Sequence, residues 1–249
     1  MSLIRQKFAL IVLATIFISN TTQAKEPDWS NYAALLKQHV SIAEHHDVQL
    51  SWVNYSQLKV DARWNSVIAQ LESFSPDQLT TRQEQLAFYI NAYNIMAIKV
   101  VVDNWPLESI KDVGNFIWPV WKRTAGKIGQ KEISLDEIEH EILRPMSEPR
   151  IHFVIVCASI SCPNLRKEPF TASRLNTQLD EQTVEFLGNS KKGIYQDGNT
   201  IHTSQIFSWF EDDFSKKGGI KVFIARYRSI SKEATIHPDI PYNWLLNGE

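Results

Sequence analysis

The clearest hydrophobic pattern in the chain lies between residues 82 and 103. Apolar and aromatic side chains recur there at spacings of three and four, which is the period of one face of an α-helix. This stripe consists of Leu86, Ile90, Tyr93, Ala97 and Val101. Phe88, Ile95 and Val102 fall on other faces, so the helix is apolar nearly all round. We therefore expect it to lie at the centre of the fold.

Two amides interrupt this apolar helix. Asn91 and Asn94 are three residues apart and lie on the same side of it. A buried amide without a hydrogen-bond partner costs about 1–3 kcal/mol, so each must meet a specific group. The two side chains either line a polar site or fasten neighbouring segments to the helix.

A second helix is predicted for residues 134–144. It opens with a Ser-x-x-Glu capping box that includes Glu137, and Pro145 ends it. Glu139 falls in the middle of the apolar arc of this helix, whereas His140 lies beyond the edge of the arc. A carboxylate on a buried face is costly unless it is paired or hydrogen bonded. We therefore expect Glu139 to be buried against a specific partner.

Both cysteines of the chain lie in the segment 151–163. Its continuous apolar run from Phe153 to Val156 predicts a β-strand that ends at Cys157. A strand that ends in a thiol and a loop of small residues can present a nucleophile at the edge of a sheet. The second cysteine, Cys162, is five residues further on, so the two can instead close a small disulfide loop.

These elements define an α+β fold. We predict a helix-rich single domain, residues 80–249, with a small central sheet that contains the strand 151–157. An N-terminal helical segment, residues 25–79, precedes it, because its apolar positions show mostly helical spacing. The tail after residue 237 is aromatic and rich in proline, and we expect it to dock on the domain in an extended form.

The first residues have the pattern of a secretory signal peptide. Arg5 and Lys7 precede an apolar stretch that ends near Ile18, and a small-x-small motif ends at Ala24. The stretch is too short to cross a bilayer, and no other run approaches about 18 consecutive apolar residues. We expect cleavage after Ala24 and export to the periplasm or the exterior, with no integral membrane segment in the mature chain.

The charge balance argues against nucleic acid as a partner. The chain has 26 Lys and Arg against 28 Asp and Glu, a net charge of −2. Because the predicted signal peptide carries two of the positive charges, the mature chain has a net charge of −4, and it contains no basic block. Nucleic acid and anionic membrane surfaces both attract basic chains.

The eight tryptophans are spread through the chain, and most are expected to serve in packing. Trp118 and Trp121 differ from the others because they lie in a stretch that resembles a loop. They are candidates for the wall of an aromatic binding pocket.

Four motifs, in this order, resemble the DUF547 family. The first motif is Phe88-Tyr89-Ile90-Asn91-Ala92-Tyr93-Asn94, and the second is the predicted helix 134–144. The third runs from His152 to Pro163 and includes both cysteines, and the fourth is Tyr242-x-Trp244-x-Leu246-Asn247. The resemblance covers about residues 80–247. It implies membership of a family of unknown function that occurs in exported bacterial proteins and in plants, and it implies no activity, substrate or cofactor.

The residues support two main hypotheses on function. In the first, Cys157 is the nucleophile of a thiol-dependent hydrolase or acyl transferase, which needs a base and oxyanion donors near the thiol. His140 is the candidate base, and Asn91, Asn94 and Glu139 are the candidate polar walls of the site.

Other residues complete this hypothetical active site. Tyr93, Ser159 and Ser161 are candidate binding residues beside the two tryptophans of the loop. His152 is a poorer base, because a regular strand would place it about 16 Å from Cys157 and on the opposite face. His202 and His237 are further alternatives.

In the second hypothesis, a Cys157–Cys162 disulfide clamps a non-catalytic module that binds a peptide or a glycan in an aromatic groove. An exported chain favours disulfides. A redox-active pair is a third alternative, although the spacing is not the C-x-x-C of thioredoxin-like proteins. No cofactor or metal site is expected, since His45, His46 and Asp47 are adjacent rather than at ligand spacing.

Overall fold

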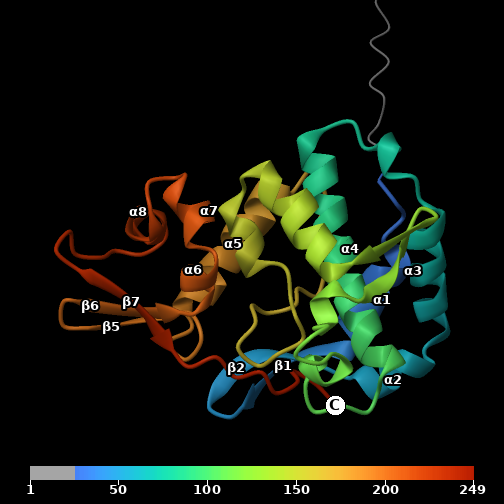
Figure 1. Cartoon of the computed structure of the whole chain (residues 1–249), viewed down its shortest axis with the longest axis horizontal. Coiled ribbons are helices and arrows are strands. Elements are labelled where there is room, and N and C mark those ends of the chain that lie inside the picture. Colours follow the sequence, from blue (N-terminus) through green and yellow to red (C-terminus); the bar gives the residue numbers. More distant parts are fainter. Residues whose placement is uncertain (1–25) are drawn as a thin grey trace, which may run out of the picture.

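The computed structural model describes residues 26–249, so the predicted signal peptide lies outside the described residues. The α+β class is confirmed: helices dominate, and the strands form small antiparallel or mixed sheets (Figure 1). The arrangement of the strands differs from the prediction. In place of one small central sheet, the described residues form three separate sheets, with strand orders β1-β2, β3-β4 and β5-β6-β7.

The regular elements follow one another along the whole described chain. The α-helices are α1 (Ser30–His39), α2 (Tyr55–Val60), α3 (Ala62–Ser73), α4 (Arg82–Asp103), α5 (Leu175–Gly188), α6 (Ile206–Trp209), α7 (Glu211–Ser215) and α8 (Ile220–Ala225). The strands are β1 (Val40–His45), β2 (Val48–Val53), β3 (Thr124–Ile128), β4 (Lys131–Ser134), β5 (Ile194–Asp197), β6 (Thr200–Ser204) and β7 (Thr235–Ile240). The short helical turns are η1 (Pro76–Gln78), η2 (Ile110–Val113), η3 (Val120–Lys122), η4 (Glu137–Leu143), η5 (Arg144–Met146) and η6 (Pro149–Phe153).

Helix α4 has the bounds predicted from its hydrophobic stripe and lies at the centre of the larger core. Thr81 and Glu84 cap its N-terminus reciprocally, because each side chain bonds the backbone N–H of the other. Within residues 26–249, α4 is the one helix long and apolar enough to cross a membrane, yet 83% of its apolar window is buried inside the protein. It is therefore placed as a core helix.

The helical prediction for the N-terminal segment is wrong for residues 40–53. These residues form the antiparallel hairpin β1-β2, with Val40 opposite Val53. His46 and Asp47 form its turn with φ values of 53° and 61°. Such a two-residue turn matches the twist of paired strands, so a local turn decided the structure here rather than the spacing of apolar residues.

The strand predicted for residues 151–157 is absent. Residues up to Phe153 belong to η6, and residues 155–157 have no regular secondary structure. Asn94 provides the hydrogen bonds that a neighbouring strand would have provided. Its Nδ2 donates to the carbonyl oxygen of Val154 at 2.9 Å, and the N–H of Val156 donates to its Oδ1 at 2.8 Å. One side chain thus satisfies this buried backbone, and no sheet is needed.

The hydrophobic interior consists mainly of two cores. The larger core surrounds α4 and also contains apolar residues of α1, α2 and α3. The smaller core contains five phenylalanines from the C-terminal half, and the ring of Phe153 lies 5.1–6.0 Å from the other four. In Figure 1, helices α6–α8 and strands β5–β7 lie on the left, and α1–α4 lie on the right. Phe153 belongs to one core and Val154 to the other, so the chain passes between the cores at the end of η6.

The C-terminal tail docks on the domain as predicted, and it braces the loop that carries the cysteines. The N–H of Ile160 donates to the carbonyl of Leu245 at 2.9 Å, and the N–H of Asn243 donates to Ser161 Oγ at 2.8 Å. Beyond this loop, the tail pairs with Val53 at the end of β2. The tail therefore positions the loop from one side.

Candidate functional site

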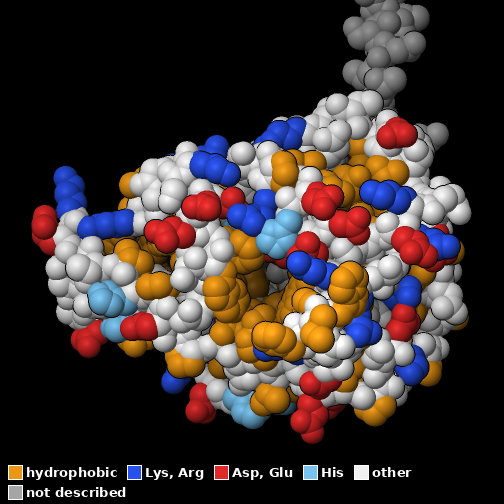
Figure 2. All heavy atoms as spheres, in the orientation of Figure 1, with side chains coloured by type: hydrophobic (Ala, Val, Ile, Leu, Met, Phe, Trp, Pro, Cys, Tyr) orange, Lys and Arg blue, Asp and Glu red, His pale blue; other side chains and the backbone are white. Residues whose placement is uncertain are grey.

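A cavity of about 440 Å³ opens beside the segment that joins the two cores. Figure 2 shows a hollow near the centre of this face, surrounded by hydrophobic side chains, with charged side chains along one part of its rim. The aromatic residues that line the cavity are Tyr93, Trp121, Trp209, Phe210, Tyr242 and Trp244. The polar and sulfur-containing ones are Lys111, Glu139, His140, His152, Cys157 and Cys162.

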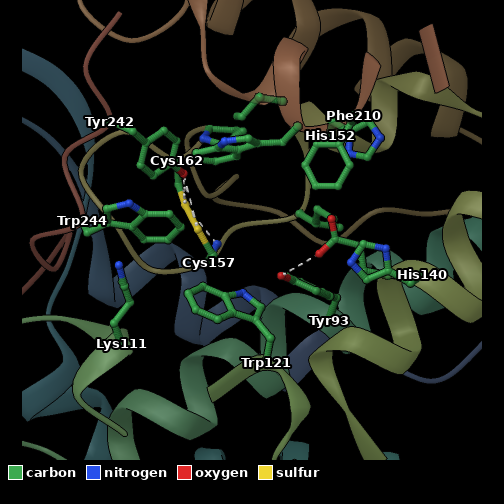
Figure 3. Close-up of a pocket in the computed structure, with 15 residues that line it drawn as sticks. Tyr93, Lys111, Trp121, His140, His152, Cys157, Cys162, Phe210, Tyr242 and Trp244 are labelled. Carbon is green, nitrogen blue, oxygen red and sulfur yellow. Dashed lines mark hydrogen bonds between the residues drawn. A yellow bond between two sulfur atoms is a disulfide. The ribbon is translucent and has the colours of Figure 1, made fainter. Parts of the chain in front are cut away.

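One wall of the cavity is a cluster of aromatic rings centred on Trp244. Its ring lies 5.8 Å from Trp209 with an angle of 22° between the planes, and 4.6 Å from Tyr242. Trp121 meets it edge-on at 5.4 Å. On another side, the ammonium of Lys111 lies 5.0 Å from the centre of the same ring, a cation–π contact that holds a positive charge at the cavity. Figure 3 shows Lys111, Trp121, Tyr242 and Trp244 around the disulfide.

Cys157 and Cys162 form a disulfide, and both line the cavity. Their Cα atoms lie 6.2 Å apart, within the range that a disulfide can join. Cys157 is half-buried, whereas Cys162 is 1% exposed. In this state Cys157 carries no thiolate, so neither cysteine is available as the nucleophile of the first hypothesis.

Three donors point at the sulfur of Cys162. The backbone N–H of Cys157 donates to it at 3.1 Å, and the hydroxyl of Ser159 does so at 3.2 Å. The hydroxyl of Tyr242, from the C-terminal tail, also lies 3.2 Å from this sulfur. A sulfur atom in a disulfide has no hydrogen to give, so the hydroxyls are the donors.

A buried lysine also bonds the loop that carries the two cysteines. Lys192 is 2% exposed, and its ammonium donates to the carbonyl oxygen of Cys162 and to Oδ1 of Asn164, both at 2.7 Å. Burial lowers the pKa of Lys192 to about 7, because the charged form loses hydration. The sequence offers no signal for this residue, because nothing in its local pattern marks a buried lysine.

Glu139 is buried, as predicted from the projection of its helix. It lies on η4, a π-helical turn after the predicted Ser134–Glu137 cap, and it is 7% exposed. Its specific partner is the hydroxyl of Tyr93, which donates to Oε2 at 3.3 Å. Burial raises the pKa of Glu139 from 4.5 to about 7. Burial therefore favours the protonated carboxyl group, which can both donate and accept hydrogen bonds.

His140 lies next to Glu139 and lines the cavity with a side chain that is 39% exposed. Arg144 donates from Nη1 to its Nδ1 at 2.7 Å, so the neutral ring carries its proton on Nε2. Partial burial lowers the pKa of His140. Its Nε2 lies 3.8 Å from Oδ1 of Asp136, so the cavity is lined by a neutral imidazole whose N–H is near a carboxylate.

His152 is the more deeply buried histidine of the cavity, at 2% exposure. Its Nε2 lies 2.9 Å from Oδ2 of Asp213, and its ring stacks on Phe210 at 4.0 Å. Burial lowers the pKa of His152 although Asp213 acts in the opposite direction. Among the described residues, its Nδ1 has no hydrogen-bond partner. The absence of the predicted strand brings this side chain to the cavity.

Asn91 and Asn94 do not line the cavity. The Nδ2 group of Asn91 donates to the carbonyl of Phe170 at 2.8 Å, and the N–H of Phe170 donates back to Oδ1 at 2.9 Å. Asn94 bonds Val154 and Val156 in the same manner. Both amides therefore tie backbone segments to α4.

The structure separates the other predicted binding residues. Trp121 and Tyr93 line the cavity, whereas Trp118 lies outside it and is 54% exposed, next to the exposed side chains of Phe116 and Ile117. Ser161 is not in the lining, and its hydroxyl accepts from the tail. In residues 26–249, no group of three or more His, Cys, Asp or Glu side chains is arranged to hold a metal ion.

Four aromatic residues of the cavity were not assigned to a site from the sequence: Trp209, Phe210, Tyr242 and Trp244. Two of them form the motif Tyr242-x-Trp244. In an extended tail, two aromatic side chains at this spacing could have indicated a binding site. Trp209 ends α6 and Phe210 follows it. Neither had such a signal, because the spacing of apolar residues around them is also that of a helix packed in a core.

The fold and the cavity define an α+β protein with a disulfide in the wall of an aromatic pocket. Residues 76–187 match the family described as "Protein of unknown function, DUF547", and this match confirms the resemblance to the DUF547 family that the sequence motifs indicated. No curated protein and no solved structure matches the chain. The matched segment contains the disulfide, Glu139 and His140, whereas residues 209–244 of the aromatic wall lie beyond its end.

Proposed function

We propose that the protein binds a peptide through an aromatic side chain that enters the cavity. The observation that carries this proposal is the cluster of Trp209, Tyr242 and Trp244, whose ring centres lie 4.6–5.8 Å apart at the cavity wall. Aromatic faces exposed in a concave site bind the rings of ligands by offset or edge-on packing. Trp209, which lines the cavity, is 46% exposed, and a ligand ring that entered the cavity would cover it.

The balance of polar and apolar groups favours a peptide over a glycan. A sugar ring carries hydroxyl groups on its whole edge, and each buried hydroxyl needs a partner. The cavity has few polar side chains. They are Glu139, His140, His152 and Lys111, and Lys111 lies beside the ring of Trp244. An aromatic side chain needs few polar partners, and Lys111 can bind a carboxylate next to it.

The thiol-dependent hydrolase or acyl transferase is a second proposal for the same cavity, and it depends on reduction of the disulfide. A reduced Cys157 would face a cavity that also holds His140 and Glu139. The π-helical turn that carries these two residues supports this proposal, since such turns occur frequently at functional sites.

Titration calorimetry of the oxidised protein tests the binding proposal. The probes are short peptides that contain tryptophan or phenylalanine, matched peptides with alanine, and a chitin trisaccharide. We expect the aromatic peptides alone to bind. Trp244→Ala should weaken this binding at least tenfold, and Trp209→Ala is a second variant in case the tail of the first is displaced.

Trp118→Ala is the matched control, because this tryptophan is exposed outside the cavity. Its peptide affinity should equal that of the unmodified protein. Equal affinity of Trp244→Ala, Trp209→Ala and Trp118→Ala would refute the assignment of the cavity. Binding of the trisaccharide in place of the peptides would refute the ligand class.

A further inference from the structure

The two sulfurs of the disulfide have unequal surroundings. Cys157 is half-buried at the cavity, whereas Cys162 is 1% exposed and surrounded by the loop, Ser159 and the tail. Exchange with a thiol requires attack on one sulfur and departure of the other. A thiolate that enters the cavity would reach Cys157 more readily, and Cys162 would then be the leaving group.

The surroundings of Cys162 suit a thiolate better than a disulfide. Its sulfur is approached by the N–H of Cys157 and by the hydroxyls of Ser159 and Tyr242, at 3.1–3.2 Å. The same two hydroxyls lie farther from Cys157 Sγ, at 3.8 and 3.5 Å. A disulfide sulfur carries little charge and is a weak acceptor, so three donors gain little from it. The same donors would stabilise a full negative charge much more, because hydrogen bonds to ionised groups are about twice as strong as neutral ones.

These donors are already in place in the oxidised protein. The tail that carries Tyr242 is held against the loop by the bond from Asn243 N–H to Ser161 Oγ at 2.8 Å, and the N–H of Asn247 donates to the carbonyl of Ala158 at 3.2 Å. Lys192 holds the carbonyl of Cys162 on the other side. The loop therefore need not reorganise to receive the charge, which is the condition for effective electrostatic stabilisation.

We propose that the Cys157–Cys162 disulfide is a centre for thiol–disulfide exchange that oxidises a peptide dithiol. A substrate thiolate attacks Cys157 Sγ and forms a mixed disulfide, while the Cys157–Cys162 bond breaks and its electron pair leaves on Cys162 Sγ. The second substrate thiolate then attacks the substrate sulfur of the mixed disulfide and releases Cys157 as a thiolate. The substrate dithiol, whose two protons passed to the solvent when its thiols ionised, has become a disulfide, and the two electrons that it lost reside on Cys157 and Cys162 as thiolates, which can take up protons from the solvent.

This proposal rests on the proposed function in one respect: the peptide substrate enters the cavity assigned above to peptide binding. The direction of exchange follows from the donors. Stabilisation of the Cys162 thiolate favours the reduced form of the protein, and a stabilised reduced form makes a pair more oxidising. The C-x4-C spacing then differs from that of thioredoxin-like proteins, but the requirement for a stabilised leaving thiolate is the same.

Equilibration with glutathione redox buffers measures the stability of the disulfide. We expect Tyr242→Phe and Ser159→Ala each to make the pair less oxidising, with a change of about tenfold in the equilibrium constant, or about 30 mV. The matched control is Tyr227→Phe, because the hydroxyl of Tyr227 bonds Asp180 away from the cysteines. It should leave the potential unchanged. Two variants on different segments keep the test valid if one of them fails to fold.

Reduction kinetics provide the second measurement. Dithiothreitol should reduce the native disulfide at least tenfold faster than the disulfide of the urea-unfolded protein, and glutathione trapped during the reaction should be found on Cys157 by peptide mass spectrometry. A native disulfide that reacts more slowly than the unfolded one, with equal potentials in all variants, would show a structural staple and overturn the proposal.

The two proposals fail in different ways. Dithiothreitol does not need the aromatic wall, so fast reduction together with absent peptide binding would overturn the proposed ligand and leave the exchange centre standing. Peptide binding that depends on Trp244, together with an inert disulfide, would do the opposite. The rate of exchange with a peptide that contains both cysteine and an aromatic residue should depend on the aromatic wall and on the disulfide.

Discussion

Two pairs of polar side chains, one on α4 and one on η4, differ in their surroundings, and only the second pair lines the cavity. Asn91 and Asn94 on α4 each bond one backbone segment through both ends of the amide. Glu139 and His140 on η4 have one hydrogen bond each, to Tyr93 and Arg144, and both line the cavity. The hydrogen-bonding groups of the first pair are all bonded to the backbone, whereas those of the second pair can still bond a ligand.

This difference shows how a structural polar residue can be distinguished from one available for a ligand. Burial does not separate them, since Asn91, Asn94 and Glu139 are all under 10% exposed. Two other properties separate the asparagines from Glu139: the number of side-chain donors and acceptors without a partner, and the presence of a cavity next to the side chain. The predictions below test whether the two pairs behave as differently as their hydrogen bonds indicate.

The largest effect is expected for Asn94→Ala. This change leaves the carbonyl of Val154 and the N–H of Val156 without partners in the interior. Each such group costs about 1–3 kcal/mol, so the free energy of unfolding should fall by about 2–6 kcal/mol. Urea denaturation measures it. Asn31→Ala, at an exposed position of α1, is the control and should change stability by less than about 0.5 kcal/mol. Equal stability of the two variants would mean that Asn94 is not a structural tie.

Glu139→Gln should stabilise the protein at alkaline pH by about 3 kcal/mol, from a pKa of about 7 in the folded state against 4.5 unfolded. Because the folded carboxyl group binds its proton more tightly, its contribution to stability is complete below pH 4.5 and is lost as the pH rises through 7. Glutamine does not titrate, so the difference between the two proteins should be near zero at pH 4 and largest at pH 8.

Urea denaturation at pH 4, 6 and 8 checks this prediction. A difference that does not vary with pH would contradict the burial of an ionisable carboxyl group. Loss of stability in Glu139→Gln at pH 8 would show that Glu139 is a structural residue of the same kind as the two asparagines.

Replacement of both Cys157 and Cys162 by serine should cost about 2 kcal/mol, the loop-closure contribution expected for so short a loop. This test is informative because Asn94 and the disulfide hold neighbouring parts of one segment. A loss smaller than that of Asn94→Ala would confirm that the amide, rather than the covalent bond, is the main support. A larger loss would reverse the order.

The smallest effect on stability is expected for His140→Gln. The side chain is 39% exposed and bonds one arginine, so the free energy of unfolding should change by less than about 1 kcal/mol. Calorimetry should nevertheless show weaker binding of the aromatic peptides, because the side chain lines the cavity. Unchanged peptide affinity together with a clear loss of stability would assign His140 to the fold.

The structure confirms what local periodicity could predict. Helix α4 has its predicted bounds, and η4 starts at the predicted capping box and places Glu139 inside and His140 at the edge. These features depend on residues within a few turns of one helix, so neighbouring positions contain the necessary information.

Predictions that required knowledge of distant partners were wrong or incomplete. The apolar run before Cys157 looked like a strand, but Asn94, some sixty residues earlier, satisfies its backbone instead. In residues 40–53, the turn at His46 and Asp47 determined a β-hairpin, although the spacing of the apolar residues had indicated a helix. In both segments hydrophobicity specified burial and left the backbone conformation to other contacts.

By itself, the sequence determined the central helix, the buried carboxyl group, the α+β class and the family motifs, because each depends on residues close together in the chain. Only the tertiary structure decided that the two cysteines are joined, that the asparagines are ties, and that Trp209, Phe210, Tyr242 and Trp244 complete the cavity. Those outcomes depend on which distant segments pack together. That packing is driven by the burial of apolar side chains in the two cores, to which residues from the whole length of the described chain contribute.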